Sequence, residues 1–203
     1  LVFQVVSALI LLFPLLPRLS TQFALSAFGV SPFLFLLILM AVFLFLIGTA
    51  NLYNFMDGIN GIAGLSGAIG FGLLGLATLY HPNPDPFQTP LSLLSLCIAL
   101  ACAGYLPFNM PRAKVFMGDV GSILLGFVFA ALVVTLAGNY LEMICFTAFL
   151  FPFYADELTT MVVRVRAGEN LTRSHRRHLY QLLVNELGIA HWKITAAYAA
   201  GQL

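Results

Sequence analysis

Long apolar stretches separated by short polar clusters are the feature that most restricts the fold of this chain. Of its 203 residues 61% are hydrophobic and only 8% are charged, whereas soluble domains carry about 25% charged residues. Membrane-spanning helices need roughly 20 apolar residues, and the stretches near that length are 32–50, 62–80, 91–108, 121–138 and 141–161. Residues 1–17 resemble another span, and 193–203 resemble the first half of a further one. The sequence therefore predicts one all-α, polytopic membrane domain over residues 1–203, with about six spans plus the start of a further one.

Helix-breaking residues mark the expected ends of the first two spans. Pro14 and Pro17 are expected to end the first span, because proline does not continue a helix. Ser31 followed by Pro32 is typical of a helix start. Since Leu1 is not a start methionine, we interpret the chain as a fragment that lacks its N-terminal part. A signal peptide is not expected, because the first stretch has neither a basic leader nor a small-residue cleavage site.

Two shorter patterns predict local structure. Gly64, Ala68 and Gly72 recur every four residues, and such a stripe of small side chains allows two membrane helices to pack closely. Between residues 171 and 187, leucines recur at helical spacing among charged and polar residues. This pattern predicts an amphipathic helix that lies at the membrane interface.

Three polar clusters, at residues 51–61, 109–119 and 174–178, interrupt the apolar stretches. Two predicted spans separate each cluster from the next, and an even number of crossings returns the chain to the side that it left. All three clusters are therefore expected to face one aqueous compartment. Of the nine Lys and Arg residues only Arg18 lies on the other side, and this positive bias identifies the cluster side as the cytoplasm. The net charge of +1 gives no indication of nucleic acid binding.

The first cluster repeats polar residues at a spacing of three. If the helix continues, Asn51, Asn54 and Asp57 share one face, and such groups should avoid lipid and face the protein interior or water. Gly58 would let a ligand or a neighbouring backbone come close. Capping of a helix end remains an equal alternative for Asn51 or Asn60 alone. The full set favours a binding site.

The second cluster places a carboxylate directly before a span. Asp119 would suit the N-cap of the next helix, but a cap does not explain the neighbouring Asn109, Arg112 and Lys114. Mg²⁺ prefers oxygen ligands, usually one or two carboxylates together with substrate phosphates. A carboxylate here that faces Asp57 would suit such an ion. We therefore predict that Asp119 binds a metal.

The third cluster, with His175, Arg176, Arg177 and His178, suits anion binding. Arginine matches phosphate geometry, and histidine can donate a hydrogen bond or move a proton near neutral pH. The alternative is a solvated positive loop that only sets the topology. Beside two acidic residues, a diphosphate clamp is favoured. Together the clusters supply the parts of phosphoryl transfer, and their position at a membrane face implies a lipid substrate.

The three motifs resemble those of the polyprenyl-phosphate N-acetylhexosamine-1-phosphate transferases, an integral membrane family often filed with glycosyltransferase family 4. They are Asn-x-x-Asn-x-x-Asp-Gly-Ile-Asn-Gly at 51–61, Val-Phe-Met-Gly-Asp-Val-Gly-Ser at 115–122 with Asn109 ahead of it, and His-Arg-Arg-His-Leu-Tyr-Gln at 175–181. The resemblance covers about residues 40–193. It implies that a polyprenyl phosphate, usually undecaprenyl phosphate, attacks the β-phosphorus of a UDP-N-acetylhexosamine. The products would be polyprenyl-diphospho-sugar and UMP, and the cofactor would be Mg²⁺, with Mn²⁺ as an alternative.

The resemblance also implies roles for individual residues. Asp119 would bind Mg²⁺, Phe116 and Gly58 would flank the uracil ring, and Asn54 and Asp57 would line the nucleotide site. The candidate catalytic residues are Asp57, Asp119, His175 and His178. The candidate substrate-binding residues are Asn51, Asn54, Gly58, Asn60, Asn109, Phe116, Arg176 and Arg177.

Departures from the family pattern bear on the substrate. Relatives also carry an adjacent pair of aspartates in an earlier cytoplasmic loop. No such pair occurs in this chain, and a fragment that begins after that loop would not contain it. Asn60 stands where the peptidoglycan branch has Asp, and the histidine motif is not that branch's three-histidine run. These differences favour a GlcNAc-like donor and the start of O-antigen (lipopolysaccharide) or other cell-surface polysaccharide synthesis. The muramoyl-pentapeptide phosphotransferase of cell wall peptidoglycan synthesis and a non-catalytic membrane carrier remain alternatives.

We expect a multi-pass protein of the bacterial inner (plasma) membrane with a cytoplasmic active site, and a homodimer is left open.

Overall fold

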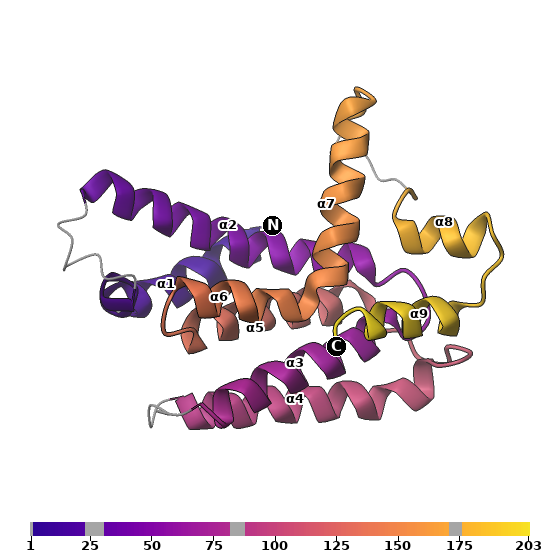
Figure 1. Ribbon diagram of the computed structural model, residues 1–203, viewed down its shortest axis with the longest axis horizontal. Helices are drawn as coiled ribbons and strands as arrows, with labels where there is room; N and C mark the ends of the chain where they lie inside the picture. The colour runs from indigo at the N-terminus through magenta and orange to yellow at the C-terminus, as the bar shows by residue number, and fades with distance from the viewer. Residues whose placement is uncertain (1, 23–30, 82–87, 171–175) are drawn as a thin grey trace.

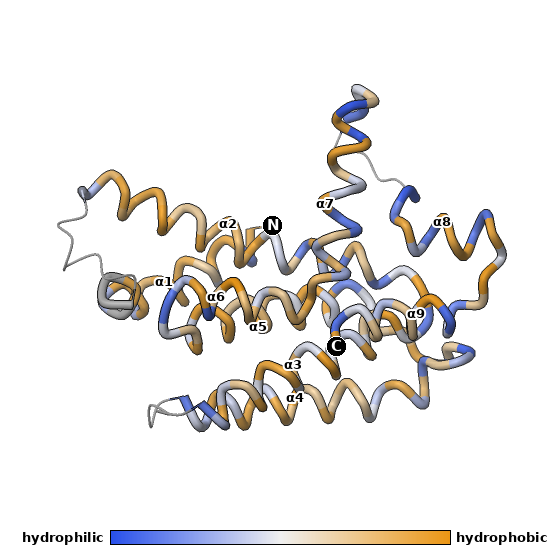
Figure 2. Tube along the Cα trace, viewed as in Figure 1, coloured by the Kyte–Doolittle hydropathy of each residue, from blue (hydrophilic) through white to orange (hydrophobic). Residues whose placement is uncertain are grey.

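The fold is a bundle of long apolar helices. The computed structural model describes residues 2–22, 31–81, 88–170 and 176–203. The helices that form the bundle are α2 (Pro32–Met56), α3 (Ile62–Leu79), α4 (Gln88–Asn109) and α5 (Gly118–Leu136) (Figure 1). Each is long and apolar enough to cross a membrane, and Figure 2 shows that hydrophobic residues occupy most of their length. The predicted all-α, polytopic membrane fold is therefore confirmed.

Further elements border this bundle. In chain order they are α1 (Val2–Gln22), α6 (Tyr140–Thr147), the 3₁₀ turn η1 (Ala148–Leu150), α7 (Phe151–Arg166), α8 (Leu179–Asn185) and α9 (His191–Ala200). α1 packs against α2, and α9 packs against α3. Because length and hydropathy qualify α2, α3, α4 and α5 as spans in the described part of the chain, the predicted number of about six spans stays a prediction.

The start of α2 agrees with the sequence, whereas the course of α1 does not. Ser31 Oγ accepts a hydrogen bond from the Leu34 N–H at 3.3 Å, and Pro32 takes the first helical position. α1, however, continues through both Pro14 and Pro17. Each proline removes one backbone hydrogen bond, and membrane helices tolerate this where local adjustments satisfy the freed group. The prediction that these prolines end the first helix was wrong.

The predicted span 141–161 is not one straight helix. α6 ends at Thr147, η1 follows, and α7 begins at Phe151 with Pro152 in its first turn. Because proline lacks the N–H that would continue the hydrogen bonding of the preceding helix, the chain changes direction at this point. α7 then leaves the bundle and runs across the direction of the other helices (Figure 1).

The small residues of α3 allow close contact with α4, and these two helices share the most extensive contacts in the structure. A Cβ added at Gly64 would lie 3.0 Å from the Tyr105 ring, and one at Gly72 would lie 3.8 Å from the Ala99 Cβ. The hydroxyl groups of Thr78 and Ser92 are 2.8 Å apart and bond across the same interface. The small-residue stripe therefore serves helix packing, as its spacing predicts.

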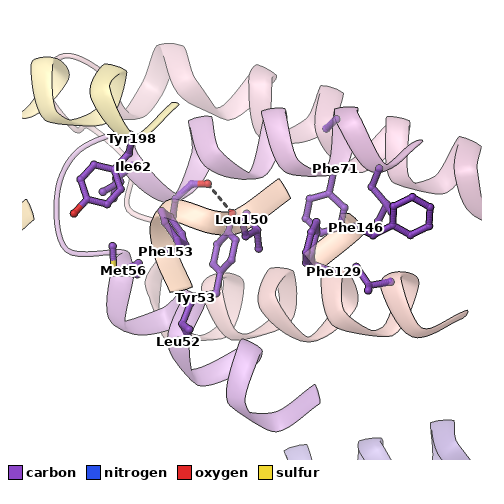
Figure 3. Packing of buried hydrophobic residues seen from close by; sticks show 14 of the residues in the cluster. Leu52, Tyr53, Met56, Ile62, Phe71, Phe129, Phe146, Leu150, Phe153 and Tyr198 are labelled. Carbon is purple, nitrogen blue, oxygen red and sulfur yellow. Dashed lines mark hydrogen bonds between the residues drawn. The ribbon is translucent and has the colours of Figure 1, made fainter. Parts of the chain in front are cut away.

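A buried aromatic cluster joins α2, α3, α5 and α7 (Figure 3). Tyr53 meets Phe153 edge to face with ring centroids 5.2 Å apart, and Phe71 meets Phe129 in the same way at 5.4 Å. The Tyr53 hydroxyl donates to the Ala63 carbonyl oxygen at 2.7 Å. This bond connects the end of α2 to the start of α3, on either side of the first polar cluster.

Gly126 of α5 lies directly against the backbone of α2. A Cβ at this position would be 2.7 Å from the Thr49 carbonyl oxygen and 2.9 Å from the Ala50 Cα. Gly126→Ala is therefore expected to push the helices apart and to destabilise the protein by about 1–3 kcal/mol, seen as a lower thermal midpoint in detergent. Gly48→Ala is the matched control, because a Cβ there meets nothing within 4 Å. Equal midpoints for the two variants would contradict this account of the interface.

Candidate functional site

Two of the polar clusters meet at one end of the bundle. Asn54, in the last turn of α2, donates from Nδ2 to Asp119 Oδ1 at 3.1 Å and to Ser122 Oγ at 2.9 Å. Asp119 lies in the first turn of α5, and Ser122 lies one turn later. The start of α3 and the end of α4 are at the same end of the bundle (Figure 1). The structure thus brings the first two clusters together, as the even number of crossings predicts.

Asp57 and Asp119, which we call the acidic pair, carry the negative charge of this site. Asp57 is the C-cap of α2, and its N–H donates to the Asn54 carbonyl oxygen at 3.2 Å. Burial, followed by the charge of Asp119, raises the pKa of the Asp57 carboxyl to about 7. The two carboxylates therefore repel each other, and either a proton or a cation would relieve that repulsion.

Asn109 holds the glycine-rich turn that follows Asp57. Gly61 has a φ of +83°, a left-handed conformation that glycine adopts without steric cost. The Gly61 N–H donates to Asn109 Oδ1 at 2.5 Å, and Asn109 Nδ2 donates to the Val115 carbonyl oxygen at 2.8 Å. Asn109 is buried, so its amide joins the turn of the first cluster to the loop of the second.

Asn60 connects the same turn to two other segments. Its Nδ2 donates to the Pro111 carbonyl oxygen at 3.1 Å, in the loop between α4 and α5. Its backbone N–H donates to His191 Nδ1 at 3.3 Å, and its carbonyl oxygen accepts from Thr195 Oγ1 at 2.9 Å. The turn is therefore attached to the start of α9 as well as to the second cluster.

Asn51 contacts α1 rather than the acidic pair. Its Nδ2 donates to the Ile47 carbonyl oxygen at 2.8 Å, and its side-chain amide exchanges two hydrogen bonds with that of Gln4, at 3.2 and 3.4 Å. Amide pairs of this kind join helices within a membrane. The contacts that the structure shows for Asn51 are thus those of helix packing.

Gly58 and Phe116, the predicted neighbours of a nucleobase, lie in different surroundings. Phe116 is 75% exposed in the loop before α5. Gly58 lies against the ring of Tyr180, which a Cβ at this glycine would overlap. The Tyr180 hydroxyl donates to the Phe55 carbonyl oxygen at 2.9 Å. Through Tyr180, α8 reaches the end of α2 beside Asp57.

The basic part of the third cluster is exposed. Arg176 and Arg177 precede α8 and face solvent, and Arg177 forms an ion pair with Glu169. His175 lies outside the described residues. The structure therefore places the two arginines at the surface, joined to the segment that follows α7.

His178 is buried beside α7 rather than beside the acidic pair. Its side chain is 4% exposed, with Nδ1 at 3.4 Å from Glu157 Oε2 and at 3.7 Å from Asp156 Oδ1. Its ring stacks on that of Tyr180, with centroids 5.7 Å apart. The contacts of His178 thus link α7 to the start of α8.

Sequence reasoning missed the role of Asp156 in holding this region. Its Oδ1 accepts from the Leu179 N–H at 2.8 Å, and its Oδ2 accepts from the Tyr180 N–H at 3.4 Å and from the Tyr198 hydroxyl at 2.5 Å. Two adjacent acidic residues in the apolar stretch 141–161 were the available signal. Ionisable groups within such stretches are costly, and they generally have partners or a function.

The acidic pair supplies oxygen donors that suit a hard cation. Mg²⁺ is usually held by one or two carboxylates, with water and substrate phosphates as its other ligands. Burial and, after it, the charge of Asp119 raise the pKa of Asp57, and a bound cation would offset the repulsion between the two carboxylates. Over the part of the chain that the structure describes, no three His, Cys, Asp or Glu residues gather in a metal-holding group. Asp57 and Asp119 are the residues of this site that could hold such an ion together with water and phosphate oxygens.

An all-α membrane bundle with amides and carboxylates gathered at one end defines a class: polytopic membrane proteins with a polar site at one membrane face. Comparison with known sequences places this chain within that class. Residues 1–137 match the family described as glycosyl transferase family 4. The chain belongs to this family.

Curated relatives show which enzymes the chain is similar to. The decaprenyl-phosphate N-acetylglucosaminephosphotransferase of Mycobacterium tuberculosis is 31% identical over 165 residues, which cover 73% of this chain and 41% of that protein. The Mycolicibacterium smegmatis enzyme of the same name is 34% identical, covering 70% and 39%. The phospho-N-acetylmuramoyl-pentapeptide-transferase of Microcystis aeruginosa is 38% identical, covering 64% and 35%. The chain therefore spans about two fifths or less of the length of these relatives.

Asp57→Asn tests the cost of ionising the Asp57 carboxyl, which comes from burial and from the charge of Asp119. Because the folded-state pKa of Asp57 lies above its unfolded value of 3.8, ionisation of this carboxyl costs stability. That cost is absent below about pH 4 and complete above about pH 7. In metal-free detergent buffer, the variant is expected to have a higher thermal midpoint than the wild type at pH 8, and the difference should shrink towards pH 5. Midpoints that differ by a constant amount between pH 5 and 8 would speak against ionisation of Asp57 as the cause.

Proposed function

We propose that the full-length protein transfers a GlcNAc-like HexNAc-1-phosphate from a UDP-sugar to a polyprenyl phosphate, such as undecaprenyl phosphate, with Mg²⁺ as cofactor. The observation that carries this proposal is the Asn54–Asp119 hydrogen bond, because it joins two polar clusters into one site at the end of an apolar bundle. Membership of glycosyl transferase family 4 and the names of the mycobacterial relatives support the donor and the acceptor. Residues 1–203 would form one transferase domain.

In this reaction, an oxygen of the polyprenyl phosphate attacks the β-phosphorus of the UDP-sugar. A new phosphorus–oxygen bond forms, the bond from the β-phosphorus to the oxygen that bridges the two phosphates breaks, and UMP leaves with that oxygen. Bound Mg²⁺ would supply positive charge that neutralises the phosphates. Asp119 would hold the ion, and the Asn54 amide orients the Asp119 carboxylate through their hydrogen bond. The Asp57 carboxylate would add a second negative charge that favours binding of the ion.

Basic residues in the segments that connect the helices suit the phosphates. Arg176 and Arg177 present exposed guanidinium groups, whose planar forks match phosphate oxygens. Arg112 and Lys114 lie in the segment between α4 and α5 and add positive charge to the rim. A concentration of Lys and Arg on one side of a membrane protein supports a cytoplasmic site. We propose that the protein lies in the bacterial inner membrane, with α8 at the membrane interface. The first part of the predicted interfacial helix, residues 171–175, lies outside the described residues.

A second candidate donor is the muramoyl-pentapeptide nucleotide of peptidoglycan synthesis. The 38% identity to the Microcystis aeruginosa enzyme favours this donor. A membrane carrier is less consistent with the structure, because a carrier needs charged or amide groups through the middle of its spans. Figure 2 shows the long helices of the bundle as predominantly hydrophobic there.

Asp119→Asn tests the reaction and the metal site together. The full-length protein with Mg²⁺ in detergent is expected to release UMP from a UDP-HexNAc only when polyprenyl phosphate is present. The variant keeps an oxygen that can accept from Asn54 but loses the charge that holds the cation. Turnover should therefore fall by about 10²–10³-fold, the usual effect of losing one preorganised electrostatic group.

Glu186→Gln is the matched control, because it removes an exposed carboxylate at the end of α8, and it should retain turnover. Undiminished UMP release in Asp119→Asn would rule out the role assigned to that residue. A comparison of UDP-GlcNAc with UDP-MurNAc-pentapeptide separates the two donors. Movement of a solute across vesicles without UMP release would favour the carrier.

A further inference from the structure

A continuous series of hydrogen bonds runs from α7 to the end of α2. It begins at Asp156, which is 6% exposed on the helix that leaves the bundle. Its two carboxylate oxygens accept from the N–H groups of Leu179 and Tyr180, which are the first residues of α8. The hydroxyl of Tyr198 in α9 bonds the same carboxylate. Asp156 therefore fixes the start of α8 against α7 and α9.

The series continues through the side chain of Tyr180. This residue is fully buried, and its hydroxyl donates to the Phe55 carbonyl oxygen at 2.9 Å. Phe55 is the penultimate residue of α2, where backbone carbonyls lack partners within the helix. The Tyr180 ring also covers Gly58, where a Cβ would overlap it. Tyr180 thus holds the backbone two residues before and one residue after the Asp57 carboxylate.

We propose that Asp156 and Tyr180 are positioning residues for the transferase site. Asp156 sets the position of the first turn of α8, and Tyr180 transmits that position to the backbone that carries Asp57. Because Asp156 holds the start of α8, it also fixes the point at which the segment with Arg176 and Arg177 joins that helix. Tyr180 acts on Asp57 through the backbone of Phe55 and Gly58, and Asp156 acts through Tyr180. This proposal rests on the proposed function, because the geometry that it maintains is that of the acidic pair and the arginines.

A purely stabilising role for these buried bonds is the alternative, and α7 offers a matched comparison. The hydroxyl of Tyr154 lies 2.7 Å from the hydroxyl of Thr49 and also joins α7 to α2. Tyr154→Phe therefore removes one tyrosine hydroxyl between the same two helices without touching α8 or Gly58. Tyr180→Phe removes the bond to Phe55 and keeps the ring, so the packing on Gly58 is retained.

Hydrogen–deuterium exchange of the backbone amides in residues 55–61 of the full-length protein measures how firmly this turn is held, independently of enzymatic activity. Tyr180→Phe is expected to raise exchange in residues 55–61 by about fivefold, the factor that corresponds to the loss of one typical hydrogen bond. Tyr154→Phe should leave this segment unchanged. Asp156→Asn should raise exchange in 55–61 and also in 179–185, because a neutral amide accepts more weakly than a carboxylate from both N–H groups.

Steady-state kinetics of UMP release supply the second readout. Tyr180→Phe and Asp156→Asn are expected to raise the KM for the UDP-sugar by about three- to tenfold, whereas Tyr154→Phe should keep the wild-type KM at a similar thermal midpoint. Equal exchange in residues 55–61 for the two tyrosine variants would overturn the proposal, as would a wild-type KM and kcat in Tyr180→Phe. If the wild type itself releases no UMP from any UDP-sugar, the proposed function fails. A selective rise in exchange for Tyr180→Phe would then still support the positioning of the turn.

Discussion

The cost of leaving a hydrogen-bonding group unpaired in hydrocarbon decides where this protein can carry chemistry. Backbone groups within a membrane are satisfied inside helices, and polar side chains must find partners or reach water. Inside the bundle, Ser95 donates to the Phe71 carbonyl oxygen at 2.8 Å, and Thr135 donates to the Ala131 carbonyl oxygen at 2.7 Å. Such small hydroxyls are satisfied by nearby backbone. Carboxylates need stronger compensation, so the acidic pair lies where α2 ends and α5 begins.

Neutral amides connect the helix ends at this site. An asparagine side chain carries both an acceptor and two donors, so it can join two segments without adding charge. Asn109 accepts from Gly61 and donates to Val115, and Asn54 donates to both Asp119 and Ser122. A lysine or an aspartate in either place would change the charge balance of the acidic pair. The amides therefore fix the geometry of the site and leave its electrostatics to the two carboxylates.

Much of the bundle could be predicted from the sequence, because the length and hydropathy of a span are local properties. Counting crossings predicted that the first two clusters share one side of the membrane, and their direct contact through Asn54 is what the structure adds. The sequence could not show what lies opposite a given helix face. Asn51 shares its spacing with Asn54 and Asp57, yet it faces Gln4 of α1. The sequence could not predict the direction of α7 either, since Pro152 is compatible both with a bend and with the first turn of a new helix.

The path of the chain after α7 follows from the same cost of burial. A carboxylate on a helix that leaves the bundle must be paired, and the groups that bond Asp156 come from Thr160 of the same helix, from the start of α8 and from Tyr198. Those bonds bring Tyr180 to the end of α2 and turn His178 towards α7. With an apolar side chain at position 156, the N–H groups at the start of α8 would lose their acceptor, and Tyr180 would keep only its ring contacts and its bond to Phe55. The position of residues 176–178 thus follows in part from satisfying a buried charge outside the acidic pair.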